Sequence, residues 1–243
     1  MNAQPGLDKW DSAKDVWELY DLTKDFSQMH DLAKENPGKL AEMKKLFLVQ
    51  AKENKVFPIG AGIWLRIHPE DRIKTPYTSW TFDDTTTRMP EFSAPAVGNH
   101  NNTVTINLEC GADASGVLYA LGGAGGGLTC YLDKGQLVFE YNLMIIDRSI
   151  AKSSEILAPG KHTIIVTTTL KAPKPGAPAD VVLSVDGKEV ARTVVKMTVP
   201  AAFTASETFD VGIDLGSPVS RDYFERRPFK FNGKISQVKV ELK

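Results

Sequence analysis

The stretch Gly126–Asn142, GGLTCYLDKGQLVFEYN, decides the fold of this chain. Apolar side chains occupy every second position on both sides of a short break, at Leu128, Cys130 and Leu132 and then at Leu137, Phe139 and Tyr141. This alternation is the period of a strand that buries one face. The break, Asp133–Gly135, carries turn residues, and Gly135 supplies the positive φ that a short connection needs. The stretch therefore predicts a β-hairpin.

The same alternation continues outward from this hairpin. It predicts strands within Val104–Leu108, Val117–Leu121, Leu143–Ser149, Ile164–Thr168, Phe209–Ile213 and Ile235–Leu242. Asp180–Val195 is a second predicted hairpin that turns at Asp186–Gly187, and the proline-rich Lys171–Ala179 is a predicted loop. Many short antiparallel strands must bury one face against a second sheet. We therefore expect a mainly β fold in which residues 103–243 form an antiparallel β-sandwich.

Residues 1–55 follow a different pattern and predict a small αβ element. Val16–Leu22 is the predicted strand, and Ser27 is a predicted cap for a turn through Leu32. Pro37–Glu53 is the predicted helix, because proline is favoured at a first helical position. Its apolar stripe consists of Leu40, Met43, Phe47 and Ala51, widened by Leu46. This stripe has little to cover it, so we expect the element to dock on the sandwich or to pair with a second chain.

Residues 56–102 form a predicted irregular arm between these two parts. Prolines and glycines recur along it and exclude long regular elements. Aromatic side chains are frequent in the same segment, which is not typical of a disordered linker. We expect an ordered arm with one edge strand at Thr78–Phe82.

Composition limits the classes of function. The chain has 243 residues, a formal net charge of −1 and a hydrophobic share of 42%. This charge gives no electrostatic reason to expect nucleic acid or an anionic membrane as partner. No apolar run approaches the roughly 18–20 residues of a membrane span, and the first residues, MNAQPGLDKWDSAKD, lack the apolar core of a secretory signal. We expect no membrane-spanning segment and no secretory signal.

The two cysteines, Cys110 and Cys130, each fall within a predicted strand. The simplest interpretation is that both are small buried apolar residues, and the alternative is a disulfide between neighbouring strands. The four histidines, at positions 30, 68, 100 and 162, have no metal-ligand spacing. The polar group His68–Asp71 is compact enough to bind a ligand, but a turn with solvated carboxylates is the favoured interpretation.

Two further stretches could carry chemistry. Gly122–Gly127 resembles a phosphate-binding loop in composition, but no lysine with serine or threonine follows it, which favours a flexible strand connection. Acidic side chains gather near Gly212 and Gly216, where loop oxygens would suit calcium. These candidate ligands are Glu207, Asp210, Asp214 and Asp222. Their spacing matches no known cation loop, so a calcium site is a hypothesis that the spacing does not favour.

Several longer motifs resemble the C-terminal region of large bacterial arylsulfatases. WELYDL at Trp17–Leu22, with Asp25 and then Asp31-Leu32-Ala33, is similar to the family's C-terminal signature, although Phe26, Gln28 and Asp31 depart from it. The extension that follows in those proteins has counterparts of Phe57–Arg72, Ala112–Gly127 and Glu207–Ser220. The resemblance implies a concanavalin-like, laminin-G-like sandwich of the jelly-roll type. It covers nearly the whole chain from Val16 onward.

The same resemblance implies that the catalytic part of the enzyme is missing. Sulfatases use a formylglycine made from the cysteine or serine of a C/S-x-P-x-R motif, and neither Cys110 nor Cys130 begins one. The acids that bind the catalytic calcium are also missing, so the sequence predicts no catalytic, cofactor-binding or metal-binding residue. Two functions remain: a structural or substrate-framing accessory region that partners a sulfatase catalytic domain, and a carbohydrate- or ligand-binding module that takes a glycan.

Overall fold

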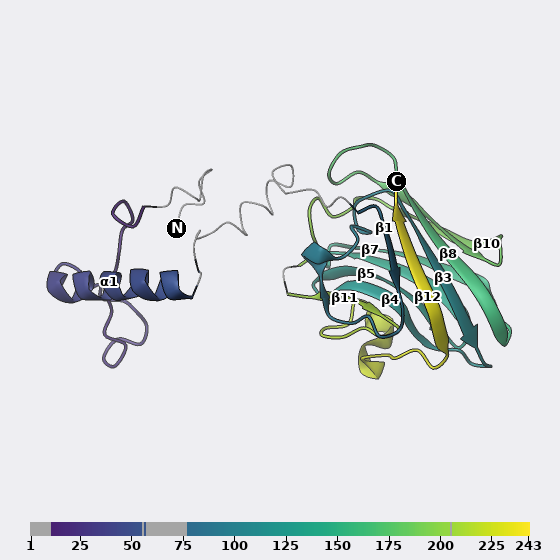
Figure 1. The fold of residues 1–243 in the computed structure, drawn as a ribbon, viewed down its shortest axis with the longest axis horizontal. Helices are drawn as coiled ribbons and strands as arrows, with labels where there is room; N and C mark the ends of the chain where they lie inside the picture. Colours follow the sequence, from purple (N-terminus) through teal and green to yellow (C-terminus); the bar gives the residue numbers. More distant parts are fainter. Residues whose placement is uncertain (1–10, 55, 57–76, 205) are drawn as a thin grey trace. The chain divides into compact units, whose positions relative to one another are not determined.

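A computed structural model describes residues 11–54, 56, 77–204 and 206–243. The chain divides into two compact units, Met1–Ile73 and Lys74–Lys243 (Figure 1). The predicted polar group His68–Asp71, the motif Phe57–Arg72 and much of the predicted arm lie outside the described residues. Within the described residues, no helix has the length and apolar character needed to cross a bilayer.

The first unit contains one regular element in its described part, the helix α1 (Pro37–Glu53). Its bounds are those predicted, and proline lies in its first turn. The indole of Trp17 packs edge-on against the ring of Phe47 at a centroid distance of 5.4 Å, and the Lys44 ammonium lies 5.2 Å from the indole. On the predicted apolar stripe only Ala51 is buried, whereas Met43 remains exposed. One face of α1 thus packs on the preceding loop.

The predicted strand Val16–Leu22 is wrong, because the segment is a loop. Its Leu19 amide donates to Oδ1 of Asp31 at 2.9 Å, and its Leu19 carbonyl accepts the Leu32 amide at 2.8 Å. These bonds satisfy the backbone locally and leave no ladder to a second strand. The predicted turn capped by Ser27 is not helical either, since the Ser27 hydroxyl donates to the Asp25 carboxylate in an irregular turn.

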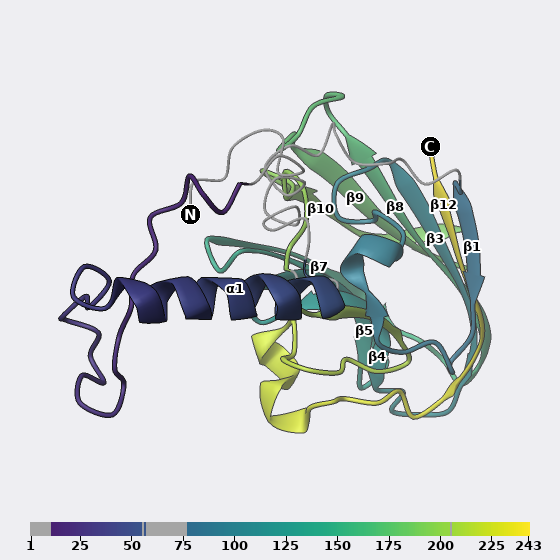
Figure 2. The same cartoon turned by 60° about the vertical axis from the view of Figure 1, so that its left-hand side comes forward.

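The second unit confirms the predicted fold class, an antiparallel β-sandwich. Sheet A has the order β1-β12-β3-β8-β9-β10, and sheet B has the order β2-β11-β4-β5-β6-β7 (Figures 1 and 2). The strands of sheet A are β1 (Ser79–Phe82), β3 (Asn102–Cys110), β8 (Gly160–Leu170), β9 (Ala179–Val185), β10 (Lys188–Val195) and β12 (Lys234–Leu242). Those of sheet B are β2 (Met89–Pro90), β4 (Gly116–Gly123), β5 (Gly126–Asp133), β6 (Gln136–Leu143), β7 (Asp147–Ile156) and β11 (Thr208–Val211).

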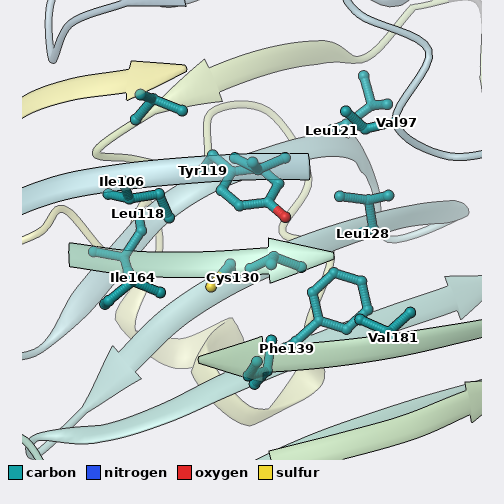
Figure 3. Packing of buried hydrophobic residues seen from close by; sticks show 14 of the residues in the cluster. Val97, Ile106, Leu118, Tyr119, Leu121, Leu128, Cys130, Phe139, Ile164 and Val181 are labelled. Atoms are coloured by element: carbon teal, nitrogen blue, oxygen red, sulfur yellow. The ribbon is translucent and has the colours of Figure 1, made fainter. Parts of the chain in front are cut away.

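The core lies between the two sheets. Tyr119, Cys130 and Phe139 from sheet B meet side chains of sheet A such as Ile106 and Ile164 (Figure 3). Each of these side chains is almost completely buried, and burial of one large apolar side chain contributes roughly 1.5–3 kcal/mol. The alternation that predicted the hairpin thus points one face of β5 and β6 into this core.

A second, smaller apolar cluster covers the opposite face of sheet B. Tyr131 of β5 points away from the main core and meets Tyr223 edge-on at a centroid distance of 5.0 Å. Tyr223 belongs to the short 3-10 helix η4 (Arg221–Arg226), and Phe229 stacks on it. The segment around η4 therefore forms a lid over sheet B, which the strand pattern did not predict.

The predicted hairpin pairs as β5 and β6 with Asp133 opposite Gln136, and the second hairpin pairs as β9 and β10. The predicted edge strand within Thr78–Phe82 is β1 at the edge of sheet A. One strand prediction is wrong at its centre, because Leu143–Ser149 contains a turn and β7 begins only at Asp147. The predicted strand connection Gly122–Gly127 does join two strands, β4 and β5, but it is shorter than predicted, because Gly122 and Gly123 pair with Gly127 and Gly126 and only Ala124 and Gly125 form the turn.

Candidate functional site

The four acids considered as calcium ligands serve separate partners. Asp210 accepts the Arg88 amide at 2.6 Å and the Thr208 hydroxyl at 2.9 Å. Asp222 lies on η4, where its carboxylate faces Arg148 and Lys152, each at 3.4 Å. These two carboxylates therefore bind different parts of the sandwich and do not converge on one position where a calcium ion could lie.

The other two acids are equally engaged. Oδ2 of Asp214 accepts the Val219 amide at 2.8 Å and the Tyr223 hydroxyl at 2.5 Å, and Oε1 of Glu207 accepts the Ser217 hydroxyl at 2.6 Å. Among the described residues, no three histidine, cysteine, aspartate or glutamate side chains are arranged to hold a metal ion. The calcium hypothesis therefore has no ligand set in this part of the chain.

Glu207 instead lines a surface pocket of about 350 Å³ at the glycine-rich end of β4 and β5. We call this the rim pocket. Its lining consists of Gly125, Gly126, Phe203, Thr204, Ser206 and Glu207. From the sequence, three of these residues are candidates for other roles. Glu207 is a candidate calcium ligand, and Gly125 and Gly126 belong to the glycine run that resembles a phosphate-binding loop.

The wall of the rim pocket is fixed by a carboxylate from a distant segment. Glu91 lies in the short 3-10 helix η3 (Glu91–Ser93), and its two oxygens accept the amides of Phe203 and Thr204 at 2.7 and 2.8 Å. The Phe203 ring packs on Tyr141 with a centroid distance of 5.2 Å and is buried. This charge-assisted pair of bonds holds the wall in place.

The floor of the rim pocket depends on the absence of side chains. A Cβ on Gly126 would lie 3.2 Å from the Met144 sulfur and 3.4 Å from the Phe203 ring, so a larger residue would crowd the pocket from below. A Cβ on Gly125 would meet nothing within 4 Å. Gly125 is therefore a lining position that can take a side chain without a clash of its Cβ with the pocket's walls.

Polar groups are concentrated on one side of the pocket. Thr204 Oγ1 accepts the amides of Ser206 and Glu207 at 3.1 and 3.4 Å, which turns this short segment around the pocket. The Ser217 hydroxyl connects Glu207 to the β4–β5 turn. It donates to the Glu207 carboxylate, and its Oγ accepts the Ala124 amide at 3.0 Å. The arrangement presents a carboxylate and hydroxyls beside an exposed glycine backbone, which is the chemistry of hydrogen-bonded recognition.

Sequence reasoning missed Phe203 and Thr204 because neither belongs to a motif. They reach the pocket through Glu91, which is more than a hundred positions earlier in the chain. The glycine run was the available signal: a series of glycines within a strand pattern indicates close approach of another segment.

The cysteines and histidines form no site among the described residues. Cys110 and Cys130 are free and buried, so the predicted small apolar role is confirmed, and burial raises the pKa of both thiols. His162 bonds to the Asp186 carboxylate at 2.7 Å and to the Ala158 carbonyl at 2.8 Å. His30 and His100 lie in loops of different units. His68 lies outside the described residues.

A buried ion pair lies on the lid side of sheet B. Glu140 of β6 is completely buried, and its Oε1 accepts Nε of Arg148 at 2.6 Å, whereas its Oε2 has no partner. The bond to Glu140 raises the pKa of the Arg148 guanidinium further, although that group is already charged at neutral pH. Arg148 also reaches Asp222 of η4. The pair therefore connects β6 and β7 to the lid.

No model of a protein family matches this chain, and no curated protein matches it. Solved structures that resemble it include mouse laminin alpha1 chain domains LG4-5, with a TM-score of 0.48 and 15% identity over 68% of this chain. The chain spans 42% of that laminin structure. Another is the CBM40 domain of Ruminococcus gnavus IT-sialidase bound to alpha2,3 sialyllactose, with a TM-score of 0.44 and 13% identity over 68% of this chain and 89% of that one. These likenesses are too distant to assign a family or a ligand, and the comparisons give the arylsulfatase resemblance no support.

Proposed function

We propose that the sandwich is a non-catalytic module that binds a carbohydrate in the rim pocket. The observation that supports this most directly is the set of groups that line the pocket. A carboxylate and two hydroxyl side chains lie beside the exposed backbone of Gly125, and partly buried hydrogen bonds hold the pocket's walls.

The pocket favours a neutral sugar over an acidic one. A carboxylate accepts hydrogen bonds from adjacent sugar hydroxyls. The Thr204 hydroxyl, which already accepts two backbone amides, can donate to a sugar, and the Ser206 hydroxyl can donate or accept. Glu207 would repel a sulfate or carboxylate group placed in the same space. A volume of about 350 Å³ lies at the small end of ligand pockets and suits one or two sugar units.

The pocket favours recognition over hydrolysis. Among the described residues that line it, Glu207 is the single titratable side chain. Glycoside hydrolysis by the usual route needs two carboxyl groups that face each other across the bond to be cleaved. The second nearby acid, Glu91, has both oxygens engaged with backbone amides, so it holds the wall and does not face a ligand.

A steric block provides the direct test. Gly125→Phe should abolish binding of neutral glycans on an array and in calorimetry, because Gly125 lines the pocket and a bulky side chain has room there to obstruct it. Gly111→Phe is the matched control, since a Cβ there also meets nothing within 4 Å and the site is elsewhere. Glu207→Gln should weaken binding while keeping the shape. Unchanged glycan binding in Gly125→Phe would rule out this pocket, and binding of no glycan by the wild-type chain would rule out the function.

A second proposed function is the accessory region of an arylsulfatase, for which the first unit provides a specific observation. The residues that resemble the family's signature form one local structure. Asp31 accepts the amides of both Leu19 and Ala33 at 2.9 Å, and Trp17 packs on Phe47 of α1. This supports the interpretation that WELYDL, the later Asp31-Leu32-Ala33 and the helix belong to one structural unit.

The two proposals are separated by the genomic DNA that precedes the codon for Met1. An in-frame C/S-x-P-x-R motif followed by a sulfatase catalytic region would support the accessory role, and an upstream stop codon would count against it. Glycan binding by the rim pocket needs its own measurement, because an accessory region of a sulfatase could bind a glycan or not.

A further inference from the structure

The turn between β6 and β7 exposes three consecutive aliphatic side chains. Met144, Ile145 and Ile146 are 41%, 59% and 77% exposed. Single apolar residues on a surface are ordinary, but a run of three at the tip of a hairpin is a feature that binding sites share. Leu143 pairs with Asp147 on either side, so these three residues form the whole connection.

The backbone of this turn is unsuited to its residues. Met144 and Ile145 have φ values of 50° and 65°, and the Ile146 amide donates to the Leu143 carbonyl at 2.7 Å. Two central residues with positive φ define the type I′ turn, where asparagine and glycine are preferred and a β-branched residue is strained.

Two other hairpins of the chain show the expected chemistry. The β5–β6 turn uses Lys134 and Gly135, and the β9–β10 turn uses Asp186 and Gly187, all with positive φ. Each places glycine second, where the β6–β7 turn has Ile145. The turn therefore departs from the rest of the sandwich in both exposure and strain, and neither departure helps folding. Strain of this kind is typical of functional positions.

The turn is held rigidly against the glycine-rich tip of β4 and β5. Asn142, which is buried, accepts the Ile145 amide with its Oδ1 at 3.0 Å. Its Nδ2 donates to the carbonyls of Ala124 and Val219 at 3.1 and 3.3 Å. The Asn142 side chain thus connects three segments: the β6–β7 turn at Ile145, the β4–β5 turn at Ala124 and the lid segment at Val219.

The same contact makes the turn continuous with the rim pocket. The Met144 sulfur and the Phe203 ring both lie against Gly126, at 3.2 and 3.4 Å from where its Cβ would be. Gly126 and Phe203 line the pocket. A molecule in the rim pocket would therefore have the exposed aliphatic turn as its immediate neighbour.

We infer that Met144–Ile146 inserts into a lipid surface and that the rim pocket binds the sugar of a glycolipid in that surface. This rests on the proposed function, because it names the form in which the pocket meets its sugar. Burial of aliphatic side chains in the lipid would supply the affinity, and the pocket would supply selectivity for the headgroup.

A lipid surface fits this turn better than a protein partner does. A stable protein interface buries about 800 Å² on each side and centres on aromatic or arginine anchors, whereas this turn offers three aliphatic side chains at a tip. The two adjacent charged residues are already paired, Asp147 with Lys196 and Arg148 with Glu140. Since the chain has a net charge of only −1, the insertion should not require anionic lipid.

The experiment is co-flotation of the full chain with vesicles of phosphatidylcholine, with and without galactosylceramide or another neutral glycolipid. Ile145→Asp with Ile146→Asp should reduce the vesicle partition coefficient at least about tenfold. Ile156→Asp is the matched control, because Ile156 is 69% exposed and lies at the opposite end of β7. It should leave partitioning unchanged.

Three results would overturn the inference. These are no flotation of the wild-type chain with any vesicle, equal loss in the Ile156→Asp control, and a concentration-dependent dimer abolished by the double aspartate variant, which would assign the turn to a second copy of the chain. Binding of soluble glycans separates the two proposals: it should survive the double aspartate variant and be lost in Gly125→Phe. Flotation on pure phosphatidylcholine that depends on the turn, without glycan binding, would refute the pocket's function and keep the insertion.

Discussion

The hydroxyl of Tyr223 donates a hydrogen bond of 2.5 Å to Oδ2 of Asp214, while Oδ1 of the same carboxyl group is buried without a partner. The Tyr223 hydroxyl also lies 3.2 Å from the Thr129 hydroxyl of β5. Tyr223 therefore connects η4 both to Asp214 and to sheet B. Burial raises the pKa of Asp214 from 3.8 to about 7, against the opposing effect of the bonds from Tyr223 and Val219.

Because the pKa of Asp214 is raised, we predict that the sandwich loses stability as the pH rises. The pKa of Asp214 is raised on folding, so its contribution is fully present below 3.8 and is lost as the pH rises to about 7. Across that window the unfolded chain has released this proton while the folded chain keeps it. The free energy of unfolding should fall by about 1.4 kcal/mol per pH unit from this group.

Urea unfolding at several pH values measures that slope, and Asp214→Asn provides the control. Asparagine can still accept the bonds from Val219 and Tyr223, but it cannot ionise. The variant should lose this component of the slope and be the more stable protein at pH 8. A variant with the same slope as the wild-type chain would show that Asp214 does not titrate in this range.

The Glu140–Arg148 pair should tolerate joint replacement better than single replacement. Arg148→Met leaves the fully buried Glu140 carboxylate without its cation and should cost roughly 3 kcal/mol, at the low end for buried pairs because Arg148 remains 32% exposed. Arg148→Met with Glu140→Leu should recover most of that loss. Thermal denaturation of both variants measures this, and equal stability of the single variant and the wild-type chain would contradict it.

The strained β6–β7 turn predicts a stabilising mutation that costs function. Ile145→Gly should raise stability by on the order of 1 kcal/mol, since glycine adopts positive φ without strain. Gly135→Ala tests the converse, because Gly135 has a φ of 81° and its added Cβ would lie 2.9 Å from Ile156. It should be destabilising. If the lipid insertion is correct, Ile145→Gly should also lower vesicle partitioning, a trade-off that a purely structural turn would not show.

The first unit should associate through its exposed apolar side chains. Phe26 and Met29 are 91% and 77% exposed, and they lie only three positions apart in the same loop. Light scattering should detect concentration-dependent dimers that Phe26→Ser with Met29→Ser abolishes and that the exposed control Lys34→Ser preserves. A monomer whose first unit resists protease would instead indicate docking on the sandwich. Rapid removal of that unit from a monomer, with the sandwich unchanged, would contradict both expectations.

The chain should not hydrolyse aryl sulfates. Both cysteines are buried, burial raises the pKa of their thiols, and neither begins a formylglycine motif. Release of nitrophenol from a nitrophenyl sulfate should stay at the uncatalysed rate. Turnover that persists through repurification and disappears in Cys110→Ala or Cys130→Ala would show that the assignment of these residues to the core is incomplete.

The sequence predicted those parts of the fold in which local chemistry and periodicity agree. The hairpins with turns at Lys134–Gly135 and Asp186–Gly187 were found because glycine occurs where positive φ is required. The β6–β7 turn was missed for the opposite reason, since Met144 and Ile145 carry no turn signal. A strand was also predicted at Val16–Leu22, but alternation alone cannot reveal that a segment has no partner strand.

The candidate site was predictable only in fragments. The sequence identified Glu207 as an acid and the glycines as a run. The pocket also needs Phe203 and Thr204, whose backbone amides are held by the Glu91 carboxylate. Such contacts join positions that are far apart in the chain and leave no periodic trace. The separate partners of Asp210, Asp214 and Asp222 were hidden for the same reason, so closeness in sequence suggested a cluster that the fold divides.

The position of β12 bears on how the protein is made. It lies between β1 and β3 in sheet A, and β12 is the one strand of the described residues that pairs with β1 (Figure 1). During synthesis β1 leaves the ribosome early and must wait, unpaired, for nearly the whole of the sandwich to follow. Sheet B, whose β4 to β7 are consecutive hairpins, can assemble before that time. A ribosome stalled just before Lys234 would therefore hold a sandwich that lacks β12, with β3 as an open edge that is prone to aggregation.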